Sequence, residues 1–150
     1  MWMKVGQQAR ILIPQNWNRY FSVFGALNPI DGEVVFQISD RKNGGSFIGF
    51  LELLLKTFPV LDIYLVVDNA TYHRSQMVKE WLVKNPKIHL IYLPPKSPQL
   101  NPIEHLWRWL KGEVAANRTY MDLEPLKRGC IETLSSLTPD DALRIAGLKS

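Results

Sequence analysis

Cysteine is nearly missing from this sequence of 150 residues, and histidine is rare. The one cysteine, Cys130, has no second cysteine with which to form an internal disulfide, and the three histidines are scattered along the chain. The Cys/His spacing of a zinc site is therefore absent, which excludes that class of metal centre. This composition fits a reducing, intracellular environment.

Long apolar runs are missing as well. No run approaches the roughly 18 residues needed to span a bilayer, and the start of the chain lacks the apolar core of a signal peptide. We therefore expect a cytoplasmic protein without membrane contact. With 46% hydrophobic and 21% charged residues, the chain has globular composition and the length of a single domain over residues 1–150.

Acidic residues are missing from residues 1–30, which contain Lys4, Arg10 and Arg19, and the whole chain has a net charge of +4. An excess of this size allows a polyanionic partner such as DNA, but it is also common in proteins that bind no nucleic acid. The charge alone leaves both interpretations open.

The apolar pattern predicts an α/β fold. Residues 20–27 and 33–38 are rich in β-branched and aromatic residues and flank the turn NPIDG, which predicts an antiparallel hairpin. Arg10–Ile13 is also β-prone. The remaining expected elements are a helix over residues 47–58, a buried strand over 63–67, a helix over 74–84, a strand over 88–93, a helix from Pro102 and a helix over 124–137, followed by a polar C-terminus. Strand, helix and strand over residues 63–93 predict a parallel βαβ unit.

Two acids mark the ends of well-signalled elements. Asp68 closes the apolar run IYLVVD, and Glu104 follows 36 positions later, in the first turn of a helix that Asn101 caps and Pro102 begins. Sites in open α/β sheets lie outside the carboxyl ends of the strands, so both carboxylates are expected to face one crevice. Hard oxygen donors of this kind suit Mg²⁺ or Mn²⁺, and two such ions about 3.5–4 Å apart can drive phosphoryl transfer. The alternative is an ordinary strand end and a common helix-capping residue.

Candidate DNA contacts flank these acids. His73, Lys96, Arg108 and Lys111 are the residues we would assign to phosphate binding, although Arg108 and Lys111 follow Glu104 at helical spacing and can equally be its ion-pair partners. Trp81, Trp107 and Trp109 are interpreted as packing residues in preference to base-stacking ones.

The segments LVVDNATYH and LPPKSPQLNPIEHLWRWLK together resemble the catalytic core of mariner-like transposases of bacterial insertion sequences, which are Asp-Asp-Glu recombinases, and FGALNPIDGEVVF resembles the hairpin of that family. The resemblance implies a ribonuclease-H-like mixed sheet flanked by helices. It implies that Asp68 is the second metal-binding Asp and Glu104 the catalytic Glu. The motif positions expected to shape the site are Asn69, His73, Pro94, Pro95, Ser97, Pro98, Asn101 and Pro102. It further implies two Mg²⁺ or Mn²⁺ ions, cleavage of DNA at transposon ends, strand transfer into target DNA, and homo-oligomers on paired ends.

One departure from the family limits these expectations. The family's first catalytic Asp lies on the first strand, before the segment that WMKVGQQ resembles, and Asp31 and Asp40 stand in positions that do not replace it. We therefore expect the first central strand and the helix-turn-helix region to be missing, and Arg10–Ile13 or a partner chain to fill the gap, or the sheet to be split. Little or no activity is expected from this chain alone. Three functions stay open: the catalytic part of a transposase completed by an upstream half, a decayed fragment, and a DNA-binding or regulatory module.

Overall fold

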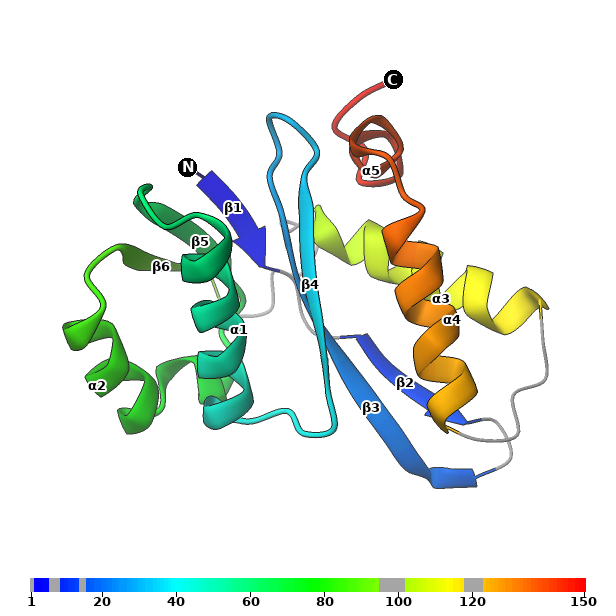
Figure 1. Cartoon of the computed structure of the whole chain (residues 1–150), viewed down its shortest axis with the longest axis horizontal. Helices are drawn as coiled ribbons and strands as arrows, with labels where there is room; N and C mark the ends of the chain where they lie inside the picture. Colours follow the sequence, from blue (N-terminus) through cyan, green and yellow to red (C-terminus); the bar gives the residue numbers. More distant parts are fainter. Residues whose placement is uncertain (1, 6–8, 14–15, 95–101, 118–122) are drawn as a thin grey trace.

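A single mixed sheet organises the computed structural model, which describes all residues except 1, 6–8, 14–15, 95–101 and 118–122 (Figure 1). Among the described residues, six strands join in the order β2-β3-β1-β5-β6, with β4 also paired to β3. The strands are β1 (Trp2–Val5), β2 (Ala9–Ile13), β3 (Asn16–Leu27), β4 (Val34–Ser39), β5 (Ile63–Val67) and β6 (Ile88–Tyr92). The α/β class and the ribonuclease-H-like mixed sheet are confirmed.

The hairpin and the βαβ unit form as the pattern predicted. β3 and β4 pair antiparallel from Leu27 opposite Val34 to Ser22 opposite Ser39, and β5 and β6 run parallel. The turn between β3 and β4 contains Gly32 at a φ of 82°, a backbone conformation that glycine adopts without steric cost.

The expected gap in the sheet is not there, and this corrects the sequence interpretation. β1 pairs antiparallel with β3 and parallel with β5, so residues 2–5 occupy the position between the hairpin and the strand of Asp68. Arg10–Ile13 does form a strand, as part of β2, but it pairs farther along β3 and does not fill that position. Without β1, the facing edges of β3 and β5 would leave backbone donors and acceptors without partners. Pairing with any extended segment that can reach these two edges is therefore favoured.

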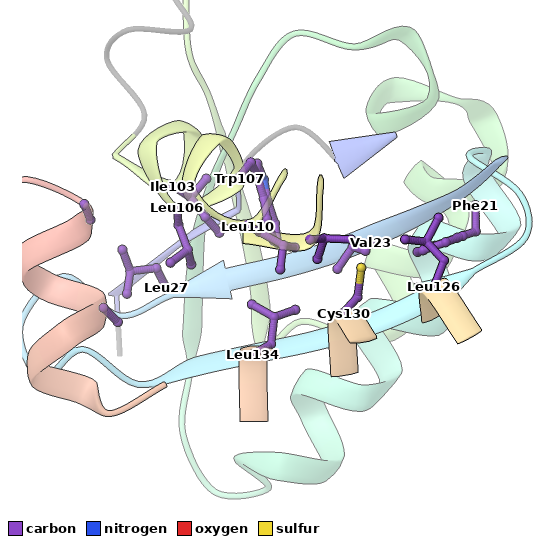
Figure 2. Packing of buried hydrophobic residues seen from close by; sticks show 13 residues of the cluster. Phe21, Val23, Leu27, Ile103, Leu106, Trp107, Leu110, Leu126, Cys130 and Leu134 are labelled. Carbon is purple, nitrogen blue, oxygen red and sulfur yellow. The ribbon is translucent and has the colours of Figure 1, made fainter. Parts of the chain in front are cut away.

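Helices cover both faces of the sheet because side chains alternate along β3. Its residues Phe24 and Ala26 pack with α1 (Gly44–Thr57) and α2 (Gln76–Lys84), together with the buried residues of β5. Its residues Phe21, Val23 and Leu27 pack on the other face with α3 (Ile103–Asn117), α4 (Leu123–Ser135) and α5 (Pro139–Ile145). Figure 2 shows this second core, with side chains of α3 and α4 meeting on β3.

The helices match the predicted ones with two additions. The 3₁₀ helix η1 (Thr71–Arg74) precedes α2, and α5 occupies part of the expected polar C-terminus. Trp107 is buried in the second core, and Trp81 and Trp109 are partly buried against the two cores, which confirms that they are packing residues. In the described part of the chain, no helix combines the length and apolar character needed to cross a membrane.

Candidate functional site

Asp68 lies directly after β5, at its carboxyl end. The strand alternates fully and partly buried residues, and Asp68 itself is 8% exposed. Its Oδ1 accepts a hydrogen bond from the backbone N–H of Ala70 at 3.0 Å, the local turn that an Asp at a strand end favours. The carboxylate is therefore held by its own loop as the chain leaves the sheet.

His73 is the second support of Asp68. Its Nδ1 lies 3.0 Å from Asp68 Oδ1 and 3.1 Å from the Asp68 carbonyl oxygen. A carbonyl oxygen can only accept, so Nδ1 carries the proton and donates to Asp68. The imidazole is 0% exposed and contacts the rings of Phe47 and Tyr72, with centroids 4.5 and 4.2 Å away.

His73, which was expected to contact phosphate, is fully buried, and its imidazole hydrogen-bonds Asp68. In this position the ring supports the Asp68 carboxylate. Tyr92 forms a further hydrogen bond to this loop, because its hydroxyl donates to the His73 carbonyl oxygen at 3.0 Å. Burial raises the pKa of Tyr92, while the charge of Arg74 acts in the opposite direction, so the hydroxyl keeps its proton at neutral pH.

Glu104 lies in the first turn of α3, as predicted, and is half-buried. Its neighbours on the helix, Ile103 and Leu106, are fully buried on the sheet. Trp107, one turn later, lies against Gly25 of β3 so closely that a Cβ on Gly25 would stand 2.3 Å from the Trp107 Cη2. Glycine at this position therefore lets α3 dock, and the docking sets where Glu104 stands.

The strand registers relate the two acids. Lys4 of β1 pairs with both Val66 and Leu27, and β3 runs antiparallel to β5. Asp68, two residues beyond Val66, is therefore level with Gly25, two residues before Leu27. Since Trp107 contacts Gly25, α3 crosses the sheet at the level of Asp68, and Ile103 and Leu106 lie over the Leu27 end of β3 (Figure 2).

The other predicted site residues are distributed unevenly. Arg108 and Lys111 are exposed on α3, where a polyanion can reach them, and Asn69 is half-buried beside Asp68. Lys96, Ser97, Pro98 and Asn101 lie outside the described residues, as does Pro95. Within the described ranges, no group of three His, Cys, Asp or Glu is arranged to hold a metal ion, so the site there has two candidate carboxylates.

Sequence reasoning missed Phe47, Tyr72 and Tyr92, whose side chains surround His73. Phe47 carried a signal for burial through helical spacing but none for contact with the site. For Tyr72, the available sequence signal was its aromatic neighbour His73. Two adjacent aromatic residues in a polar loop favour burial of that loop.

Comparison with known proteins decides the family. The family model described as DDE superfamily endonuclease matches residues 1–127, which include Asp68 and Glu104. The chain belongs to the DDE superfamily endonucleases. It is 31% identical over 139 residues to an insertion element IS630 protein of Shigella sonnei, and 36% identical over 112 residues to the Tc3 transposase of Caenorhabditis elegans. These matches cover 92% and 71% of this chain, but only 40% and 33% of the relatives' own lengths.

Solved structures share the fold of this DDE superfamily member. The catalytic domain of the Mos1 mariner transposase superposes with a TM-score of 0.74 at 16% identity, over 97% of this chain and 75% of that domain. The catalytic core domain of HTLV-2 integrase, in complex with magnesium, gives a TM-score of 0.64 at 12% identity, over 91% of this chain and 87% of that one. Mos1 catalytic domains have also been solved with manganese and with magnesium.

Proposed function

We propose that this chain is a catalytic part of a DNA transposase that cleaves phosphodiester bonds at transposon ends and transfers the freed strand to target DNA. The observation that supports the proposal is that α3, which bears Glu104 in its first turn, crosses the sheet at the level of Asp68 within the matched DDE region. Asp68 and Glu104 are proposed as metal ligands. DNA is the proposed partner, with two copies acting on paired ends, as the paired-end complex of Mos1 transposase suggests.

The donors in the described part of the chain fit Mg²⁺ or Mn²⁺. Both ions prefer oxygen ligands, and Mg²⁺ is commonly held by one or two carboxylates while waters and substrate phosphates complete its octahedron. Asp68 and Glu104 supply two such carboxylates, and no cysteine competes for a softer metal because Cys130 is buried in the core. A bound divalent ion would lower the pKa of a water or hydroxyl and stabilise charge on the leaving oxygen.

The chain's own residues prepare the site for that ion. The hydrogen bonds from Ala70 and His73 fix one oxygen of Asp68 before any metal arrives, which lowers the entropic cost of binding. The packed start of α3 does the same for Glu104. A third carboxylate, from an upstream transposase half, is proposed to complete the site, and we expect little or no cleavage by this chain without it.

The proposal is tested with the chain, a matching upstream half, Mg²⁺ and DNA that carries the transposon ends. We expect strand cleavage that Asp68→Asn and Glu104→Gln each abolish, and that the control Glu113→Gln on the same helix leaves intact. Metal binding gives a readout independent of activity, since Mn²⁺ should raise the melting temperature of the wild type more than that of Asp68→Asn.

Cleavage that survives Glu104→Gln would remove Glu104 from its role. DNA binding that weakens with salt, without cleavage in any mixture, would instead favour a binding or regulatory module. Absence of both would favour a decayed fragment.

A further inference from the structure

Three exposed cations lie on the loops that lead into α1 and α2. Arg41 and Lys42 follow β4, and Arg74 ends η1. Within the described residues, none of the three has an acidic partner within ion-pair distance. The acid next to them in sequence, Asp40, is engaged by Lys127 of α4 at 2.8 Å.

The two loops form one surface. Lys42 Nζ stands 5.9 Å from the centroid of the Tyr72 ring in η1. A Cβ on Gly44, at the start of α1, would lie 2.8 Å from Ser75 Oγ, directly after Arg74. Figure 1 shows the start of α1 beside the segment that enters α2. We call Arg41, Lys42 and Arg74 the basic loop surface.

This surface adjoins the candidate site. The Tyr72 ring contacts His73, and His73 hydrogen-bonds Asp68. Arg74 directly follows His73 in η1, and the His73 carbonyl oxygen accepts a hydrogen bond from the Tyr92 hydroxyl. The basic loop surface is therefore one layer of side chains away from the proposed metal ligand.

We propose that Arg41, Lys42 and Arg74 bind the phosphate backbone of the DNA strand that enters beside Asp68. The proposal rests on the proposed function and adds where the substrate is held. Unpaired, exposed cations are suited to phosphates because they release condensed counterions without first breaking an ion pair. Lys and Arg contacts to phosphate carry no sequence information, so this surface positions the strand and does not select its sequence.

Fluorescence anisotropy with a labelled DNA duplex tests the proposal over a series of salt concentrations. The triple variant Arg41→Gln, Lys42→Gln, Arg74→Gln is compared with the control Lys56→Gln, Lys84→Gln, Lys87→Gln. The control removes the same charge at the far ends of α1 and α2 and at the turn before β6, where the lysines are also exposed. Urea unfolding checks that both variants are folded.

The loop variant should bind on the order of tenfold more weakly at moderate salt, with a slope of log affinity against log salt reduced by about 2.7, close to 0.9 for each lost phosphate contact. The control should stay near the wild-type slope. Equal losses in both variants, or none in either, would overturn the basic loop surface while leaving DNA as the partner. Failure of the wild type to bind DNA at low salt would overturn the proposed function together with it.

Discussion

Asp68 and Glu104 are fixed to the same sheet by different kinds of contact. Asp68 is held by hydrogen bonds from residues within five positions of it, Ala70 and His73. Glu104 depends on the packing of α3 on β3, decided by Trp107 against Gly25 and by the buried residues on either side. One acid is positioned locally and the other by tertiary structure.

The two acids should respond differently to changes in the structures that hold them. Local hydrogen bonds in a short loop re-form as soon as β5 and η1 are in place, whereas the position of α3 requires the whole second core. Changes in that core should therefore move Glu104 and leave the Asp68 loop intact, and changes at His73 should do the reverse.

The largest expected effect comes from Gly25→Ala. The added methyl would stand 2.3 Å from Trp107 Cη2 and 2.7 Å from Cζ2, so the buried ring and α3 must shift. Overpacking of this kind costs about 1–3 kcal/mol, and we expect the upper end because the ring is only 3% exposed. Urea unfolding measures the loss.

Two variants sharpen this prediction. Gly112→Ala changes an exposed glycine of α3, where an added methyl would have nothing within 4 Å. It should raise the free energy of unfolding by about 0.5–1 kcal/mol through helix propensity. Gly25→Ala combined with Trp107→Phe should cost less than the sum of the single changes. An additive double variant would show that the two side chains do not compete for space.

His73→Ala is next in size. It removes a fully buried ring and the donor to Asp68, and we expect a loss of about 2 kcal/mol. His73→Asn restores a donor near the Nδ1 position and should recover part of the loss, together with part of the Mn²⁺ affinity. His89→Ala is the matched control, because the His89 side chain is 40% exposed and its loss should be small.

Equal stability and equal Mn²⁺ affinity for His73→Ala and His73→Asn would show that His73 fills space and does not position Asp68. Urea unfolding and a calorimetric Mn²⁺ titration give the two readouts.

Sequence could predict the parts of this arrangement that rest on periodic patterns. The apolar run before Asp68 specified β5, and the spacing of Ile103, Leu106 and Trp107 specified the buried side of α3. The place of Glu104 in the first helical turn followed from the start signals of Asn101 and Pro102. These signals are local, so they appear without knowledge of the partners.

The rest depended on long-range pairing or on short segments. Residues 2–5 carry too few positions for a pattern, and the free edges of β3 and β5 decide that they become a strand. α5 was missed because only Ala142 is fully buried along it, although Thr138 caps it and Pro139 begins it, a recognisable start signal. The burial of His73 needed Phe47 from another helix.

Cys130 makes the second core sensitive to alkaline pH. Burial raises the pKa of its thiol from 9.0 to about 12, so the folded chain keeps the proton where the unfolded chain loses it. This contribution to stability is complete below about pH 9 and is lost as pH rises toward 12, by about 1.4 kcal/mol for each pH unit. Between pH 8 and 10 the wild type should lose on the order of 1 kcal/mol more than Cys130→Ala. Parallel pH profiles for the two proteins in urea unfolding would contradict the assignment.

The smallest expected effect concerns the ion pair between Lys127 of α4, on one face of the sheet, and Asp40, just before α1 on the other face. Lys127 of α4 reaches Asp40, before the loop into α1, at 2.8 Å, but Asp40 is 77% exposed. Exposed ion pairs contribute about 0.2–1 kcal/mol, so Lys127→Met, which keeps a long apolar side chain at this position near Phe21, should cost no more than about 0.5 kcal/mol. Glu124→Gln, which removes the longer 3.5 Å pair, should cost less.

Unfolding is followed by urea titration with one probe on α1 and one on α4. Coincident transitions in both variants would show that the sheet, and not this ion pair, couples the α1 face to the α4 face, whereas separated transitions in Lys127→Met would show the opposite.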